Sequence, residues 1–298
     1  MTLTTQREGR VQVPGGSVWY RIEGNGPGTP LLLLHGGPGA GHDYLEPLAQ
    51  LGDERPVVFY DQLGCGKSDI PQDTSLWKVP RFADELAALR RALGLNRVHL
   101  LGQSWGGWLA IEYMMGKTAG IASLTLANTS ASSHIFETGA VRLVEQLPDD
   151  VRTTIERCES EGTTGSPEYA AASMAFMQAY VCRLPEWPEY LLRTGINVQV
   201  SPVYSAMWGP SEFTCTGVLK DWDRKKRLGE IKVPTLVVNG EYDNSLAGGK
   251  KTASLIPGAV HKILPKTGHA CNIEDPAGFD AFVIEFLRAH HLMPPLPS

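Results

Sequence analysis

One stretch of the chain reads Leu100-Leu101-Gly102-Gln103-Ser104-Trp105-Gly106-Gly107-Trp108. The apolar, β-prone residues that lead into it stop at Gly102, and residues with helical spacing begin just after Ser104. Ser104 is therefore predicted to lie on a very tight turn from a strand into a helix. A strained residue tolerates no bulky neighbours two positions away, and glycines occupy both of those positions. Such a turn would hold the serine hydroxyl in a cleft and direct the Trp105 N–H, at the helix start, toward an oxyanion.

Strand-like and helix-like segments alternate on both sides of this turn. Strands are expected at 31–34, 57–60, 123–127, 235–239 and 260–264, with a hairpin of two edge strands within 11–22. Helices are expected at 81–93 and 276–290, each with apolar residues at helical spacing. The alternation predicts an α/β fold with a mostly parallel sheet and helices on both of its faces. Functional residues should lie beyond the C-terminal ends of the strands.

The pattern changes between residues 130 and 222. This segment contains no clean buried strand, and prolines interrupt its helical stretches at 142–147, 151–159, 168–184 and 187–192. We interpret 130–222 as a helical cap inserted into the fold. The cap divides the sheet-containing core into a first part, 1–129, and a second part, 223–298.

Two residues further along the chain could complete a catalytic triad with Ser104. A serine hydroxyl is a weak nucleophile until a base accepts its proton, and the base needs an acid that orients it and stabilises its charged form. Asp243 follows the strand expected at 235–239, and His269 follows the strand expected at 260–264. The order serine, aspartate, histidine, each just past a strand, is that of an α/β-hydrolase. The sequence thus predicts Ser104 as nucleophile, His269 as base and Asp243 as its orienting acid.

A glycine-rich segment, Gly36-Gly37-Pro38-Gly39, follows the first buried strand. A hydrolase of this type needs a second oxyanion donor at that point, and glycine lets the backbone come close to the reacting carbonyl. We therefore assign the Gly37 N–H as the partner of the Trp105 N–H in an oxyanion hole. His35, just before this segment, is expected to brace the loop rather than to take part in catalysis.

The bulk composition excludes several classes of function. The chain has 298 residues and a formal net charge of −5, so it offers no basic field for nucleic acid or for an anionic membrane surface. Its 5 cysteines are scattered and form no C-x-x-C pair, which argues against a disulfide framework and against a zinc site. The polar N-terminus does not look like a signal peptide, and no apolar run approaches the ~20 residues of a membrane span. A cytoplasmic location is the simplest expectation.

Three motifs stand out: His35-Gly36-Gly37-Pro38-Gly39, Tyr60-Asp61-Gln62-Leu63-Gly64-Cys65-Gly66-Lys67-Ser68 and Gly102-Gln103-Ser104-Trp105-Gly106-Gly107. Together they resemble the proline iminopeptidase family of α/β-hydrolases, with its L-amino acid amidase and tricorn-interacting aminopeptidase branches. The similarity continues through 208–213, 220–223 and 240–243, so it runs nearly from end to end. The resemblance implies an α/β-hydrolase fold and an enzyme that removes an N-terminal residue, often proline, or cleaves an amino acid amide. It also implies that no metal or cofactor is used.

The resemblance further implies where the free amine of a substrate binds. Glu212 matches a cap glutamate with this role, and a carboxylate in a water-poor pocket suits an ammonium group. The aminopeptidase branch carries a second glutamate just after the triad aspartate, whereas this chain has Asn244 there. An amide accepts a hydrogen bond from an ammonium but cannot neutralise it, so either Glu212 suffices or the substrate is not a simple free-amine peptide. The cap aromatic residues Tyr204, Trp208 and Phe213 are expected to line the site.

The sequence therefore favours a serine hydrolase that acts through an acyl-enzyme on a small peptide or an amino acid amide. Two alternatives remain open. An esterase, a lactonase or a biosynthetic hydrolase would act on a substrate without the ammonium group, which the change at Asn244 would explain. A noncatalytic ligand-binding protein with the same fold would keep the pocket and lose turnover, although the complete triad argues against it. The oligomeric state does not follow from the sequence.

Overall fold

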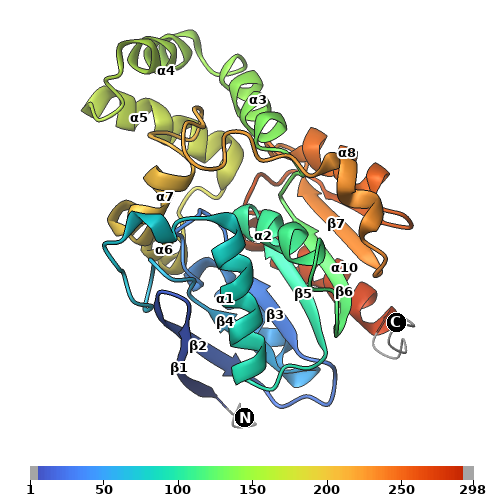
Figure 1. The fold of residues 1–298 in the computed structure, drawn as a ribbon. Coiled ribbons are helices and arrows are strands. Elements are labelled where there is room, and N and C mark those ends of the chain that lie inside the picture. Colours follow the sequence, from blue (N-terminus) through green and yellow to red (C-terminus); the bar gives the residue numbers. More distant parts are fainter. Residues whose placement is uncertain (1–5, 291–298) are drawn as a thin grey trace.

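The computed structural model describes residues 6–290, which form an 8-stranded sheet with the strand order β1-β2-β4-β3-β5-β6-β7-β8 (Figure 1). The strands are β1 (Arg7–Val13), β2 (Gly16–Glu23), β3 (Leu31–Leu34), β4 (Val57–Tyr60), β5 (Val98–Gln103), β6 (Ile121–Ala127), β7 (Thr235–Gly240) and β8 (Val260–Leu264). The pairs β1–β2 and β2–β4 are antiparallel, and every later pair is parallel. The predicted mostly parallel sheet with an edge hairpin is confirmed.

Helices cover both faces of this sheet, as the alternating pattern predicts. The α-helices are α1 (Val79–Ala92), α2 (Trp105–Met114), α3 (Ser133–Val144), α4 (Asp149–Glu161), α5 (Pro167–Phe176), α6 (Glu189–Val200), α7 (Pro202–Met207), α8 (Leu246–Leu255), α9 (Cys271–Glu274) and α10 (Pro276–Ala289). The 3₁₀ segments are η1 (Asp43–Asp53), η2 (Thr74–Leu76) and η4 (Lys225–Glu230), and η3 (Met177–Val181) is a π-helical turn. None of the helices within residues 6–290 combines the length and the apolar character needed to cross a bilayer.

The centre of the sheet is buried on both sides, and its strands β3 and β4 are apolar throughout. In β3, Leu32 and Leu34 pack into the cluster that contains α1 and α2, whereas Leu31 and Leu33 pack into the cluster that contains η1 and α10. Successive side chains of a strand point to opposite faces, so an unbroken apolar run supplies both clusters at once. This is the arrangement that the run at 31–34 predicts.

Helices α3 to α7 follow one another between β6 and β7 and lie above the sheet in Figure 1. Helices α3, α4 and α5 enclose an apolar cluster of their own, which includes Val144, Ile155, Tyr169 and Phe176, whereas α6 and α7 pack into the clusters of the core. These helices occupy the segment that we interpret as a cap. The boundaries at residues 130 and 222 stay a prediction.

Helix α3 begins earlier than the sequence pattern indicates. It starts at Ser133, whereas the apolar spacing placed this helix at 142–147. Gly139 weakens the helical pattern in the sequence, because glycine is a poor helix former. The structure needs glycine there: an added Cβ would lie 2.0 Å from the backbone carbonyl oxygen of Asn244.

The helix expected at 168–184 is interrupted. Helix α5 ends at Phe176, and the chain continues into η3. The carbonyl oxygens of Tyr180 and Val181 accept hydrogen bonds from the backbone of His269 and Ala270. Contacts with a loop distant in sequence therefore shape this segment, and local propensity does not reveal them.

Candidate active site

Ser104 lies at the junction between β5 and α2, where the sequence predicts it. β5 ends at Gln103, α2 begins at Trp105, and Ser104 between them has φ +55° and ψ −123°. A positive φ is uncommon for a residue other than glycine and is typical of the strained turn that presents a nucleophile. Ser104 lines a cavity of about 400 Å³ whose opposite walls come from the cap.

Close backbone contacts require both glycines of this turn. A Cβ added at Gly102 would lie 2.2 Å from the carbonyl oxygen of Gly106, and one added at Gly106 would lie 1.9 Å from that of Leu34. Since the obstructing atoms belong to the backbone, no side-chain rotation can relieve the clash. The glycines are thus needed because the backbone of α2 lies so close to that of β3.

We expect Gly106→Ala to lower the free energy of unfolding by about 3 kcal/mol, because α2 and β3 must move apart. Urea denaturation followed by circular dichroism measures this difference. Gly116→Ala is the matched control: an added Cβ there has no atom within 4 Å, and the free energy of unfolding should change by less than about 1 kcal/mol. Equal losses in the two variants would contradict the packing argument.

Asp243 and His269 follow neighbouring strands and meet at one edge of the sheet. His269 Nδ1 lies 2.8 Å from Asp243 Oδ1. His269 lines the same cavity as Ser104, and the ring of Phe136 packs edge-on against the imidazole with centroids 5.6 Å apart. Because Nδ1 faces the aspartate, Nε2 is the nitrogen available for proton transfer. This arrangement can supply a nucleophile, a base and an acid that orients the base.

Asp243 is buried and accepts hydrogen bonds from several directions. Besides His269, the donors are the side-chain amides of Asn128 and Asn239, both at 2.9 Å, and the Ser245 N–H and hydroxyl at 2.9 and 2.6 Å. Burial alone would raise the pKa of Asp243, but the charge of His269 and the hydrogen bonds from His269, Asn239 and Ser245 lower this pKa to about 2. Asp243 is therefore ionised at neutral pH and holds the imidazole in one tautomer.

The environment of His269 favours its protonated form. Burial on its own would lower the pKa of His269, but the charge of Asp243, the hydrogen bond to it, and the charges of Glu212 and Glu274 together raise this pKa above 6.5. A base must be neutral to accept a proton. The form able to activate a hydroxyl therefore predominates only at a pH above the ordinary histidine value.

Gly37 and Trp105, the predicted oxyanion donors, lie at the same cavity as Ser104. Gly37 belongs to the loop after β3 and has φ +103°, a conformation that favours glycine. A Cβ added at its neighbour Gly36 would lie 3.0 Å from the Cβ of Ser104. The loop therefore passes directly beside the nucleophile turn.

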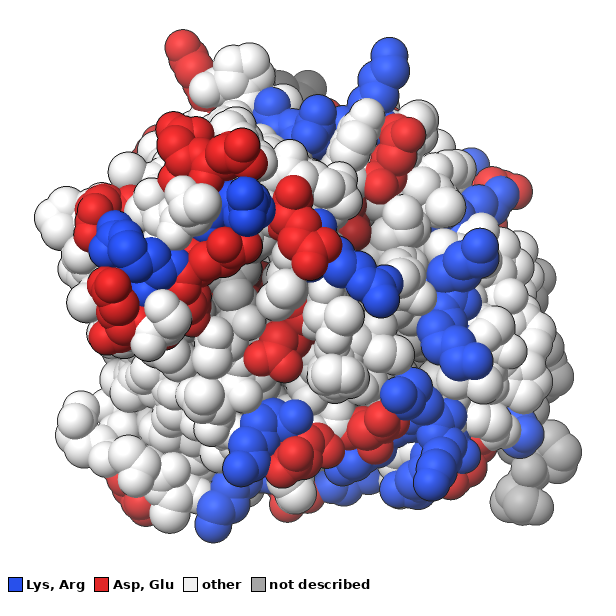
Figure 2. Space-filling model, turned by 90° about the horizontal axis from the view of Figure 1, so that it is seen from above, with Lys and Arg blue, Asp and Glu red and all other residues white. Residues whose placement is uncertain are grey.

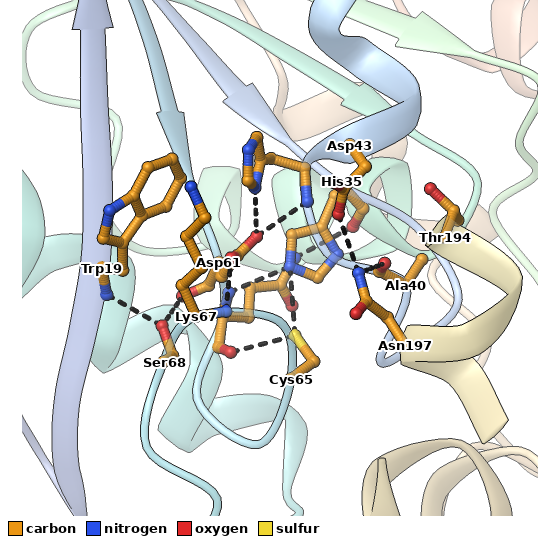
Figure 3. A network of polar contacts seen from close by, with 12 residues as sticks. Trp19, His35, Ala40, Asp43, Asp61, Cys65, Lys67, Ser68, Thr194 and Asn197 are labelled. Atoms are coloured by element: carbon orange, nitrogen blue, oxygen red, sulfur yellow. Dashed lines mark hydrogen bonds and ion pairs between the residues drawn. The ribbon is translucent and has the colours of Figure 1, made fainter. Parts of the chain in front are cut away.

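Side chains of the core and of the cap hold this loop from two sides (Figure 3). From the core, the Gln62 N–H donates to His35 Nε2 at 2.9 Å. From the cap, the Asn197 side chain on α6 donates to the Ala40 carbonyl oxygen at 3.0 Å. His35 thus braces the loop, as the sequence suggests.

One group within residues 6–290 could offer ligand atoms to a metal ion. His42, Asp43 and Glu46 bring three such atoms within 4.8 Å of one another. Arg193 of α6 already pairs with the two carboxylates, at 2.7 Å to Asp43 and 2.8 Å to Glu46. The guanidinium offsets part of their charge, and these ion pairs tie the cap to the core. The reaction is still expected to need no metal.

Three of the residues predicted to bind substrate lie on the cavity wall, namely Tyr204, Trp208 and Glu212. The Tyr204 hydroxyl donates to Glu212 Oε2 at 3.0 Å. Burial raises the pKa of Glu212 above its ordinary value, although the charge of His269 and the hydrogen bond from Tyr204 act to lower it. A cation entering the cavity would stabilise the ionised carboxylate further.

The other two predicted residues, Phe213 and Asn244, are placed elsewhere. Phe213 packs edge-on against Phe176 in the cap cluster, with ring centroids 4.8 Å apart. Asn244 is buried under α3, with its backbone against Gly139. The structure therefore does not bring these two side chains to the cavity, contrary to the sequence expectation. Phe213 directly follows Glu212, and its side chain points to the other side of that segment.

Several residues that build the site escaped the sequence analysis. The Gly36 N–H donates to the Tyr44 hydroxyl, and this hydroxyl donates to Gln103 Oε1, both at 2.7 Å. Gln103 Nε2 donates to the His269 carbonyl oxygen at 3.1 Å. This chain of hydrogen bonds connects three loops of the site and has no local signal in the sequence. Asn128 did have a local signal in the sequence. It is a polar residue directly after the buried strand β6, where site residues are expected.

The cap carries an excess of acidic side chains. Residues 130–222 contain 12 Asp and Glu against 6 Lys and Arg, a net charge of −6, compared with −5 for the whole chain. Figure 2 shows acidic side chains gathered around a few basic ones over the end of the cap that α4 and α5 form. Arg152 and Arg157 of α4 pair with neighbouring carboxylates. An acidic cap attracts cationic ligands toward the molecule.

Comparison with known proteins matches most of the chain. A family described as alpha/beta hydrolase fold matches residues 29–276. A protein of Heyndrickxia coagulans named proline iminopeptidase is 42% identical, and the alignment covers 95% of this chain and 99% of that protein. A proline iminopeptidase of Levilactobacillus brevis is 39% identical, with 91% of this chain and 93% of the relative covered.

Solved structures give the same result. The crystal structure of the proline iminopeptidase of Mycobacterium smegmatis superposes with a TM-score of 0.90 at 35% identity and covers 96% of this chain and 99% of its own. The crystal structure of VinJ superposes with a TM-score of 0.92 at 36% identity, covering 95% and 99%.

Proposed function

This chain belongs to the proline iminopeptidase family of alpha/beta hydrolases, and we propose that it is a serine hydrolase that releases the N-terminal residue, above all proline, from small peptides or amides. One observation carries the proposal. His269, which is paired with the buried Asp243, and the carboxylate of Glu212 face one apolar cavity together with the strained Ser104. The pair supports hydrolysis, and the carboxylate supports recognition of a free amine.

The first half of the reaction forms an acyl-enzyme. Ser104 Oγ attacks the substrate carbonyl carbon while His269 Nε2 accepts the hydroxyl proton and Asp243 stabilises the imidazolium. The Gly37 and Trp105 N–H groups stabilise the resulting oxyanion, each by about 3 kcal/mol. The C–N bond then breaks, and His269 transfers its proton to the leaving nitrogen.

The second half releases the amino acid. A water molecule gives its proton to His269 and attacks the ester carbonyl, which forms a second oxyanion in the same hole. Collapse of this intermediate breaks the bond to Ser104, and the serine recovers its proton from His269. Every proton in the cycle passes through one imidazole.

Glu212 gives the site its preference for an N-terminal residue. The cavity wall around it is largely apolar, so a substrate ammonium loses its water and needs a charged partner. Glu212 supplies this partner. Its carboxylate also accepts a hydrogen bond from the Tyr204 hydroxyl. A blocked or internal residue has no ammonium and leaves the buried carboxylate without a positively charged partner. The acidic cap adds a long-range attraction for the positively charged amine of the substrate.

We expect wild-type protein to hydrolyse prolyl p-nitroanilide and to lose at least about 100-fold in kcat/KM on its N-acetyl derivative. Glu212→Gln should lower kcat/KM for the free-amine substrate by roughly 100-fold, the effect of losing a charge-assisted hydrogen bond in a buried site. Initial rates from the released p-nitroaniline measure both effects.

Glu145→Gln is the matched control, since it removes one acidic charge from an exposed position of the same cap. Its kcat/KM should stay within about twofold of wild type, because a distant surface charge acts only weakly. Equal rates on the free and acetylated substrates would contradict recognition of the amine and favour an esterase-like enzyme. Failure to hydrolyse either substrate would contradict the proposed function.

A further inference from the structure

Three apolar side chains form one continuous wall of the cavity: Met174 of α5, and Met177 and Val181 of η3. We refer to these three residues as the methionine wall. Met174 is 52% exposed although it lines the cavity, so the wall runs from the interior of the cavity to the solvent. Neither the triad nor the amine site uses these residues.

Backbone hydrogen bonds fix this wall to the histidine loop. The His269 N–H donates to the Tyr180 carbonyl oxygen at 2.8 Å, and the Ala270 N–H donates to that of Val181 at 2.7 Å. The approach is close, since a Cβ added at Gly268 would lie 2.3 Å from the Tyr180 carbonyl oxygen. The methionine wall is therefore held beside the imidazole by the main chain itself.

We propose that the methionine wall binds the residue that follows the scissile bond and selects a large apolar side chain at that position. This inference rests on the proposed function. With the amine at Glu212 and the carbonyl carbon at Ser104, the leaving nitrogen must reach His269, which gives it a proton. The peptide beyond that nitrogen then passes η3, the element bonded to the histidine loop, and leaves the cavity along Met174.

The chemistry of the wall determines which side chains it accepts. Its three side chains carry no charge and no hydrogen-bond donor, so an ionic or amide side chain placed against them loses water without gaining a partner. A leucine, methionine or phenylalanine side chain gains burial instead. Methionine is unbranched and polarizable, and two methionines can adapt to apolar groups of different shape. The wall thus selects substrate side chains by their polarity more than by their shape.

The sharpest substrate pair is Pro-Leu-NH₂ against Pro-Asn-NH₂, because leucine and asparagine have similar size and opposite polarity. We expect kcat/KM of the wild-type protein to be roughly tenfold higher for the leucine peptide. Prolinamide, which lacks a second residue, serves as the reference for the basal reaction. Release of free proline, followed by chromatography, gives all three rates.

Met174→Gln and Met177→Gln replace an apolar wall residue by a polar one of similar length. In each variant the leucine-to-asparagine ratio should fall to about 3 or less, and because the ratio is internal, a general loss of activity cancels. Val141→Gln is the matched control: it makes the same kind of change at a cap residue that is 45% exposed on α3, and it should keep the wild-type ratio.

Binding measurements separate selection from turnover and cover a variant that folds poorly. On a Ser104→Ala background, calorimetry should show the same preference for Pro-Leu-NH₂ in Kd, and Met174→Gln should reduce it. A wild-type ratio near 1, or an unchanged ratio in both methionine variants, overturns the inference while prolinamide hydrolysis leaves the proposed function standing. Failure to hydrolyse prolinamide and both dipeptides overturns the proposed function and this inference with it.

Discussion

Ser104→Ala is expected to lower kcat by about 10⁶-fold, because the variant has no atom that can form the acyl-enzyme. The residual rate reflects substrate binding and oxyanion stabilisation alone. Thermal unfolding should stay close to wild type, since the change removes one hydroxyl from a residue whose strained backbone and flanking glycines remain. Steady-state hydrolysis of prolyl p-nitroanilide measures the loss.

A fluorophosphonate probe tests the same residue independently of substrate. Wild-type protein should be labelled at one peptide, the one that contains Ser104, and Ser104→Ala should not be labelled. Ser205→Ala is the control, because Ser205 is an exposed serine of the cap whose hydroxyl bonds only to its own helix turn, at Pro202. Residual activity above about one per cent in Ser104→Ala, or labelling of another serine, would show that the nucleophile lies elsewhere.

Asp243→Asn should lower kcat by about 10⁴-fold, because an amide can hold His269 in the wrong tautomer and cannot stabilise the imidazolium. It should also change the pH profile. The charge of Asp243 is the main influence that raises the pKa of His269 against the effect of burial. Without this charge the pKa of His269 falls.

The sign of the pH effect follows from the need for a neutral base. In wild type, kcat/KM should rise with pH through a midpoint above 6.5, as the imidazolium loses its proton. In Asp243→Asn the midpoint should move to lower pH, while the plateau rate drops. Asp150→Asn, at an exposed position of α4, should keep both the rate and the midpoint. A midpoint that is the same in wild type and Asp243→Asn would exclude His269 as the titrating base.

Much of the core was predictable from short-range sequence patterns. The unbroken apolar runs placed β3 and β4 at their observed bounds, because a strand buried on both faces must be apolar at every position. The glycines around Ser104 predicted the strained turn, since only glycine fits where α2 approaches the backbone of β3. The positions of Asp243 and His269 followed from their place after successive strands.

The cap was predicted less well, for a physical reason. Its helices pack on the core and on one another through contacts between residues distant in sequence, as with Gly139 against the backbone of Asn244. Because of such contacts, α3 starts earlier than predicted, and the helix predicted at 168–184 ends at Phe176 and continues as a π-helical turn. The direction of Phe213 depends on the same packing, because its neighbour Glu212 faces the cavity while Phe213 enters the cap cluster.

The amino-acid order alone therefore located the sheet, the strained serine and the two residues that follow β7 and β8, since each depends on a few adjacent positions. The folded chain was needed to show that Asn128, Asn239 and Ser245 surround Asp243, and that the backbone of η3 holds the methionine wall beside His269. The contact of Asn128 with Asp243 and the contact of η3 with His269 join segments far apart in the chain. They exist only once the strands have paired and the cap has packed against their ends.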